Sequence, residues 1–167
     1  SGEGKDENLA IFNSITHIGA NPPLLGFIQR PATVDRHTYQ NILKYKHYSF
    51  NIIAEDFFEK AHQTSARYGI GINEFKEVGL TAMYKEKIRC PFVAESPLHI
   101  ALELHEDIEI KSNKTRLIVG KVISISSLDS LAENKFELDF QKLKSISISG
   151  LSDYYTLNKL KSLNYAK

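Results

Sequence analysis

The stretch LHIALELHEDIEIKSNKTRLIVGKVISI, residues 98–125, carries a strong strand signal. Leu98, Ile100, Leu102 and Leu104 occupy every second position, which is the period of a strand with one buried face. Residues 107–110 extend that strand, residues 111–114 form a polar turn, and residues 115–125 return as a second strand. The stretch therefore predicts a long hairpin of two antiparallel strands.

The rest of the chain predicts more short strands and only a few helices. Residues 38–45 have helical spacing of apolar side chains, Asp56 is placed to cap a helix over 56–67, and Gly79 is placed to end a helical turn over 74–78. Further strands are predicted over 9–16, 24–28, 48–53 and 146–148, and the tail after Gly150 is expected to be a loop. Strands and helices do not alternate regularly, which disfavours a doubly wound parallel sheet. We expect one mainly β domain over residues 1–167, a closed antiparallel β-barrel with peripheral helices.

Bulk composition narrows the function classes. The chain has 167 residues and a formal net charge of +1, so nothing in its charge points to nucleic acid or to a membrane surface. No apolar run approaches the roughly 18 residues that a membrane span needs, and no leader pattern precedes residue 9. A single cysteine, Cys90, excludes an intramolecular disulfide, and we expect a cytoplasmic protein.

Common catalytic and cofactor motifs are missing from the sequence. It holds no glycine-rich dinucleotide fingerprint, no phosphate loop, no Cys-x-x-Cys pair and no His-Glu-x-x-His, so a nicotinamide substrate would bind without a Rossmann fold. His99, Glu103 and His105 share one strand face, but the two histidines lie roughly 20 Å apart along a strand, so we interpret this face as solvated and predict no metal site. Cys90 precedes Pro91 without a clear activating base, and we assign no catalytic residue.

Hydroxyl and amide side chains recur near strand ends and helix starts between residues 9 and 65, together with Arg30. Such a set suits a bound phosphate and a polyol, because arginine pairs with phosphate and hydroxyls add further hydrogen bonds. The alternative from chemistry alone is that Ser14 and Thr16 are ordinary strand residues, Thr38 caps a helix, and Arg30 is solvated.

Several short motifs together resemble one known family. They are Asn8-Leu9-Ala10 followed by NPPLLGF at 21–27, Glu74-Phe75 with Gly79-Leu80-Thr81, Glu95-Ser96-Pro97-Leu98, and Ser149-Gly150-Leu151 with Tyr154-Tyr155. In this order they resemble the flavin reductase-like family, the FMN-binding split barrels that include flavoredoxin and ferric reductase. The resemblance implies an antiparallel split barrel, FMN as the cofactor, NADH or NADPH as the electron donor, and a homodimer with FMN near the subunit interface.

The same resemblance implies which side chains bind the cofactor. The segment beside the isoalloxazine ring is matched by Ser14, Ile15, Thr16 and His17. The phosphate turn is matched by Arg30 and Thr33, and the helix start beneath it by Thr38 and Asn41. A segment that reaches the ring or its ribityl chain is matched by Gln63, Thr64 and Ser65, and the resemblance implies that Tyr155 closes the site. Members of the family usually carry a further segment, including a first strand, before the Asn-Leu-Ala motif, so we expect that an N-terminal segment is lacking here.

Three functions remain open from the sequence. The first is a flavin oxidoreductase that passes electrons from NADH or NADPH to flavin or to a downstream acceptor. The second is a non-catalytic FMN-binding electron carrier, and the third is a β-barrel interaction module without a cofactor.

Overall fold

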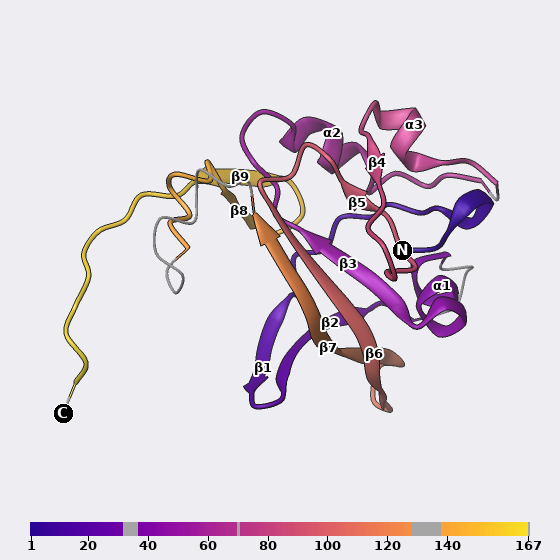
Figure 1. Cartoon of the computed structure of the whole chain (residues 1–167), viewed down its shortest axis with the longest axis horizontal. Coiled ribbons are helices and arrows are strands. Elements are labelled where there is room, and N and C mark those ends of the chain that lie inside the picture. The colour runs from indigo at the N-terminus through magenta and orange to yellow at the C-terminus, as the bar shows by residue number, and fades with distance from the viewer. Residues whose placement is uncertain (32–36, 70, 128–137, 167) are drawn as a thin grey trace.

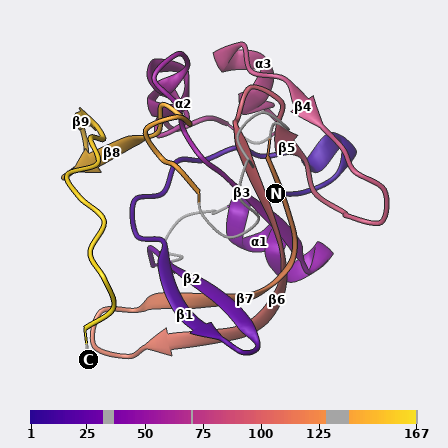
Figure 2. The same ribbon diagram turned by 60° about the vertical axis from the view of Figure 1, so that its left-hand side comes forward.

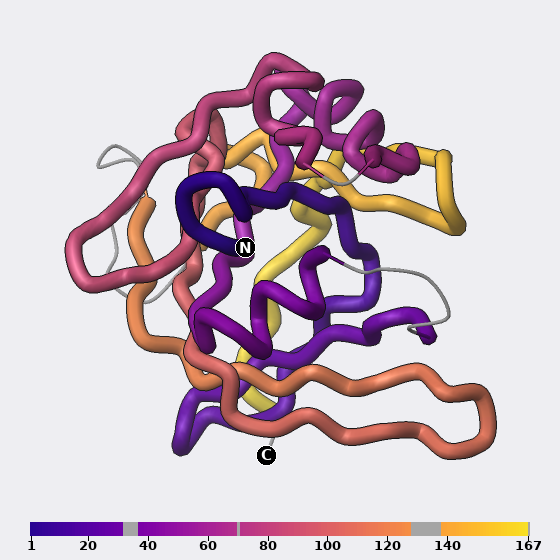
Figure 3. Tube along the Cα trace, turned by 90° about the vertical axis from the view of Figure 1, so that its right-hand side faces the viewer, coloured from indigo at the N-terminus to yellow at the C-terminus, as the bar shows by residue number. Residues whose placement is uncertain are grey.

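The predicted hairpin is the longest feature of the fold. In a computed structural model that describes residues 1–31, 37–69, 71–127 and 138–166, β6 (Leu98–Ile110) pairs with β7 (Thr115–Ser127) over their whole length. The register shifts between Ala101 and Leu102 and again between Leu104 and Glu106, and such irregularities bend a strand pair. The hairpin curves around the molecule, and its closed end projects beyond the rest of the chain (Figure 3).

The hairpin forms the centre of a five-stranded antiparallel sheet (Figures 1 and 2). The order is β1 (Thr16–Ala20), β2 (Pro23–Gln29), β7, β6 and β3 (His47–Asn51). Across the described part of the chain, no hydrogen-bonded ladder joins β1 to β3, so the curved sheet is open at that seam. The mainly β antiparallel barrel is confirmed, and its form is that of a split barrel.

Within the described ranges, two small hairpins and three α-helices complete the fold. β4 (Ala82–Met83) pairs with β5 (Phe92–Val93), and β8 (Ile146–Ser149) pairs with β9 (Asp153–Thr156). The helices are α1 (His37–Tyr45), α2 (Phe58–Gln63) and α3 (Glu74–Val78), and a short 3-10 turn, η1, spans Gly4–Asp6. In Figure 1, α2 and α3 lie together at one end of the sheet, and α1 lies at another. Among the described helices, none is long and apolar enough to span a membrane.

The core has two parts, one under each group of helices. Phe27, Ile42, Tyr48, Phe50, Leu102 and Ile118 form a cluster between the sheet and α1. A second cluster joins α2, α3 and β5, and it consists of Ala54, Phe57, Ala61, Phe75, Val78, Leu80 and Val93.

The short helix α3 forms as predicted because both of its ends are capped. The side chain of Asn73 accepts a hydrogen bond from the Lys76 amide, which satisfies one of the free N–H groups of the first turn. Gly79 adopts a left-handed conformation with φ of 67°, which ends the helix at low steric cost.

Three predicted elements differ from the observed ones. Residues 9–15 are not a strand, since Leu9, Asn13 and Ser14 make hydrogen bonds to α3, to Gly150 and to Ile28 instead of a ladder. The helix predicted over 56–67 is shorter, from Phe58 to Gln63, and Asp56 does not cap it. The tail after Gly150 is not all loop, because Gly150 has φ of 63° and turns the chain back so that β9 pairs with β8.

The prediction that His99 lies on a solvated strand face is wrong. His99 is 7% exposed, and its Nε2 lies 2.7 Å from the Val93 carbonyl oxygen, with the Phe92 ring against it. Burial lowers the pKa of the His99 imidazole. β5 covers this end of β6, so both of its faces are buried there, which alternation in one strand cannot reveal.

Candidate functional site

A groove of about 640 Å³ lies where six segments of the chain meet. These segments are residues 8–14, the end of β2 with Arg30, the start of α1, the loop after α2, the start of α3 and the turn between β8 and β9. Small-molecule sites in proteins usually have volumes of about 300–1,000 Å³. The groove is lined by Asn8, Leu9, Ala10, Ile11, Phe12, Asn13, Ser14, Ile28, Gln29, Arg30, His37, Thr38, Thr64, Ser65, Ala66, Arg67, Tyr68, Gly69, Glu74, Ile148, Gly150 and Leu151.

One wall of the groove is the irregular segment 8–14, which specific side chains hold in place. The Ser14 hydroxyl accepts from the Ile28 amide at 3.1 Å, so the side chain replaces a strand partner. Asn13 Nδ2 donates to the Gly150 carbonyl at 2.8 Å and ties the turn of the β8–β9 hairpin to this wall. The amides of residues 10–13 have no backbone or side-chain acceptor within the described ranges. The segment therefore leaves peptide groups available to a ligand.

Other lining residues of the groove carry positive charge or free donors. Arg30 and Arg67 are exposed, and neither guanidinium forms an ion pair with any carboxylate of the described residues. The N–H groups of Arg67, Tyr68 and Gly69 likewise have no acceptor within that part of the chain. Two unpaired guanidinium groups near free backbone N–H groups suit a phosphate.

A buried carboxylate, that of Glu74, also lines the groove, beside segment 8–14. Glu74 is 5% exposed, and its two oxygens accept hydrogen bonds from Asn8 Nδ2 at 2.9 Å and from the Leu9 amide at 3.3 Å. The Thr38 hydroxyl in turn donates to Asn8 Oδ1 at 2.5 Å. This network joins α3, segment 8–14 and α1 at the groove.

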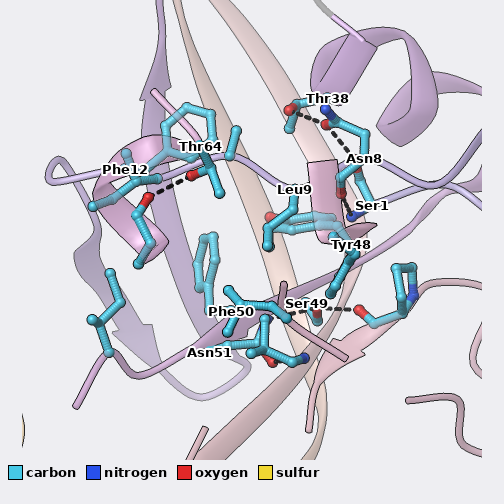
Figure 4. A pocket seen from close by; sticks show the side chains of 18 of the residues that line it. Ser1, Asn8, Leu9, Phe12, Thr38, Tyr48, Ser49, Phe50, Asn51 and Thr64 are labelled. Carbon is cyan, nitrogen blue, oxygen red and sulfur yellow. Dashed lines mark hydrogen bonds between the residues drawn. The ribbon is translucent and has the colours of Figure 1, made fainter. Parts of the chain in front are cut away.

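A separate cavity of about 100 Å³ lies inside the barrel, on the other side of residues 8–12 (Figure 4). Its lining is mainly apolar and includes Phe12, Phe27, Phe50 and Phe57, with Thr38 and Thr64 at the boundary that it shares with the groove. The cavity is much smaller than a cofactor, so the groove is the candidate site.

The structure brings together five of the predicted site residues, namely Ser14, Arg30, Thr38, Thr64 and Ser65, around the groove. Thr64 is buried and its hydroxyl donates to the Ala61 carbonyl at 2.7 Å, so it shapes the loop after α2. Ile15 lines the interior cavity instead of the groove.

Other predicted residues lie away from the groove. Thr16 and His17 are exposed on β1, and Gln63 and Tyr155 are exposed on α2 and β9. Asn41 is buried, and its Nδ2 donates to the Asp6 carbonyl at 2.7 Å. Thr33 lies outside the described residues.

Sequence reasoning missed several groove residues, of which Arg67, Asn13 and His37 carry the most polar chemistry. Arg67 stands two positions after the predicted Ser65, and its signal was a cation in a glycine-bounded loop after a helix, at Ala66-Arg67-Tyr68-Gly69. Asn13 and His37 each adjoin a predicted residue, Ser14 and Thr38, that also lines the groove.

The single cysteine is not part of this site. Cys90 is fully buried, and burial raises the pKa of its thiol to about 11. The thiolate is therefore a minor form near neutral pH, which does not suit a nucleophile.

The comparisons with known proteins agree with the fold. The chain is similar to a candidate flavin reductase with a split barrel domain from Shewanella frigidimarina, with 38% identity, a TM-score of 0.93, and coverage of 99% of this chain and 83% of that one. It has the fold of flavoredoxin of Desulfovibrio vulgaris, with 20% identity, a TM-score of 0.81, and coverage of 93% and 81%. It also has the fold of an NADH:FAD oxidoreductase from Streptomyces globisporus, solved with NAD and FAD fragments, with 16% identity, a TM-score of 0.64, and coverage of 76% and 71%.

A family match covers most of the chain. Residues 1–146 match the flavin reductase like domain, and this range includes the whole five-stranded sheet, the three helices and most of the groove. With the split barrel and the groove in place, the chain belongs to the flavin reductase-like family.

Proposed function

We propose that the groove binds FMN and that the chain works as a flavin oxidoreductase, passing electrons from NADH or NADPH to the flavin or to a downstream acceptor. One observation carries the proposal: two guanidinium groups and several backbone N–H groups, all without a partner among the described residues, line one groove of cofactor size in a chain of this family.

The residues present fit the chemical parts of FMN. The phosphate is a dianion, and Arg30 and Arg67 are the fixed positive charges on the groove. The ribityl chain is a polyol, and Thr38 and Ser65 offer hydroxyls to it. The ring has a polar edge and apolar faces, and residues 10–13 offer peptide N–H groups without an acceptor among the described residues, beside the half-buried side chains of Leu9, Ile11 and Phe12.

The protein's own contribution is to bind, orient and shield. Arg30 and Arg67 would anchor the phosphate, and the peptide N–H groups of segment 10–13 would stabilise negative charge at the polar edge of the ring. Leu9, Ile11 and Phe12 would exclude water from one side of it. Bound FMN supplies the redox chemistry, which explains why the groove needs no acid, base or nucleophile of its own.

The proposal that a nicotinamide, NADH or NADPH, is the electron donor rests on the family and on the similar fold of the Streptomyces protein solved with NAD and FAD fragments. The sequence has no Rossmann fingerprint, so the donor would have to reach the flavin through the open side of the groove.

The anchoring role predicts a specific binding pattern. Arg30→Ala and Arg67→Ala should each weaken FMN binding by about 1.5–3 kcal/mol, roughly tenfold to 150-fold, as for a hydrogen bond to a charged group. Affinity for riboflavin, which has no phosphate, should change little. Titration of each variant with both flavins, followed by flavin fluorescence, measures this.

Arg89→Ala is the matched control, because Arg89 is exposed, is paired with Glu3 at 3.2 Å and does not line the groove. Its affinity for both flavins should equal that of the wild type. Equal losses for FMN and riboflavin in the Arg30 and Arg67 variants would remove the phosphate anchor from the proposal.

A second experiment separates the enzyme from an electron carrier. Anaerobic rapid mixing of the FMN-loaded protein with NADH or NADPH should bleach the absorbance of the oxidised flavin. Absorbance that persists with both donors would reject the oxidoreductase and leave the electron carrier. A protein that binds no FMN at all would reject both.

A further inference from the structure

We infer that Glu74 is a positioning residue: it fixes the direction of the hydrogen bonds that run through Asn8, so that the Thr38 hydroxyl presents an acceptor, and not a donor, to the groove. The ligand group at Thr38 is then a hydroxyl of the polyol and not the phosphate. The inference rests on the proposed flavin site and assigns one part of the flavin to one place in it.

The direction follows from what each group can donate. A carboxylate only accepts hydrogen bonds, and the two oxygens of Glu74 are both used, by Asn8 Nδ2 and by the Leu9 amide. Asn8 must therefore turn its NH₂ toward Glu74, which leaves its Oδ1 facing Thr38. The Ser1 hydroxyl also donates to Asn8 Oδ1, at 3.2 Å, which agrees with an oxygen at that position.

The constraint then passes to Thr38. Asn8 Oδ1 accepts the hydroxyl proton of Thr38, so that proton is not available to a ligand (Figure 4). Thr38 lines the groove and is only half-buried, and what its oxygen retains is lone pairs. A phosphate oxygen also offers only lone pairs, whereas a polyol hydroxyl can donate to Thr38.

Burial keeps this arrangement from relaxing. Asn8 is 6% exposed and Glu74 is 5% exposed, so water competes little for their hydrogen bonds. Reversal of the Asn8 amide would place its oxygen against the carboxylate, and two buried acceptors in contact are unfavourable.

Glu74→Gln removes the constraint with almost no change in shape. The glutamine oxygen can still accept from the Leu9 amide, but its NH₂ then faces Asn8 and forces the Asn8 amide to reverse. Thr38 would accept from Asn8, and its proton would point elsewhere. The variant therefore changes the polarity of a hydroxyl that lies two hydrogen bonds away.

The test is a double-mutant cycle read in flavin affinity. Glu74→Gln should weaken both FMN and riboflavin about threefold when Thr38 is present, and by less than about 1.5-fold in a Thr38→Val background, because the effect passes through the Thr38 hydroxyl. Thr38→Val alone should weaken FMN and riboflavin by the same factor, about fivefold, and Thr38→Ser should restore the affinity. Glu77→Gln, an exposed glutamate of the same helix, is the control and should change neither affinity.

Two results would overturn the inference. One is a loss confined to FMN in Thr38→Val, which would place the phosphate at Thr38. The other is an equal effect of Glu74→Gln with and without the Thr38 hydroxyl, which is what a merely structural role predicts. If Glu74→Gln does not fold, the same cycle with Asn8→Ala decides between these outcomes.

The proposed function fails in a different way. A wild-type protein that binds neither flavin rejects the FMN site itself, and this inference falls with it. Wild-type binding with additive mutant effects rejects only the role of Glu74.

Discussion

The hydroxyl of Tyr48 should make the protein less stable, and its removal should raise stability. Tyr48 is 2% exposed, and its oxygen has no hydrogen-bond partner in the part of the chain that the structure describes. Its ring makes edge contacts with Phe27 and Phe50 in the core cluster below α1. Tyr48→Phe keeps these ring contacts and deletes only the buried hydroxyl.

The magnitude follows from two opposing effects. An unsatisfied buried hydroxyl costs about 1–3 kcal/mol. The void left by one oxygen atom is about 15 Å³ at most and costs about 0.4 kcal/mol. The free energy of unfolding should therefore rise by about 0.6–2.6 kcal/mol, which for a chain of this length raises Tm by about 2–4 °C per kcal/mol.

The gain in stability from Tyr48→Phe should be larger at alkaline pH. Burial raises the pKa of Tyr48 well above the ordinary value near 10, so between pH 10 and the raised pKa the unfolded chain loses a proton that the folded chain keeps. Below pH 10 the ionisation of Tyr48 does not lower the free energy of unfolding of the wild type. Above pH 10 it lowers that free energy by up to about 1.4 kcal/mol per pH unit. Tyr48→Phe lacks this loss, so its advantage should widen above pH 10.

Urea denaturation followed by circular dichroism, at neutral pH and again above pH 10, measures both effects. Tyr39→Phe is the control, because the Tyr39 hydroxyl donates to Asp107 Oδ2 at 2.8 Å; that variant should lose about 1.5 kcal/mol. A Tyr48→Phe protein no more stable than the wild type would show that the hydroxyl is satisfied in solution and would refute the reasoning.

Two further predictions concern the same core. Gly120→Ala should lower the free energy of unfolding by about 1–3 kcal/mol, because the new Cβ would lie 2.2 Å from the Tyr48 hydroxyl oxygen and 3.0 Å from Leu102 Cβ; Tyr48→Phe in the same chain should recover part of the loss in urea denaturation, and full additivity would contradict the clash. Cys90, fully buried and with a pKa of about 11, should resist a thiol reagent at about pH 8 in the native protein and react in denaturant; rapid labelling of the native protein would contradict its burial.

Local sequence determined the elements whose stability is local. Alternation from Leu98 to Leu104 predicted β6, and the four residues of the turn predicted its partner β7, because a hairpin is specified by neighbouring residues. Gly79 predicted the end of α3, because a cap acts within one turn, and the structure adds the cap by Asn73 at its start. The family motifs, spread over the chain, were enough to predict the split barrel.

Tertiary structure decided where a side chain had a distant partner. Residues 9–14 carry a strand-like pattern, yet three of them bind α3, Ile28 and Gly150, and the segment lines the groove instead. His99 belongs to the polar positions of an alternating strand, yet β5 covers it. A pattern within one strand records its own alternation and not what packs against it.

The candidate site shows the same division. The polar segments around Ser14, Arg30, Thr38 and Ser65 were predicted from the sequence, and the fold brings them to one groove. Glu74, which accepts a hydrogen bond from Asn8, lies 66 positions from it in the chain, and the packing of α3 against segment 8–14 joins the two. The sequence specifies the type of each side chain. The direction of a hydrogen bond depends on which groups lie next to it in space, and only the folded chain determines those neighbours.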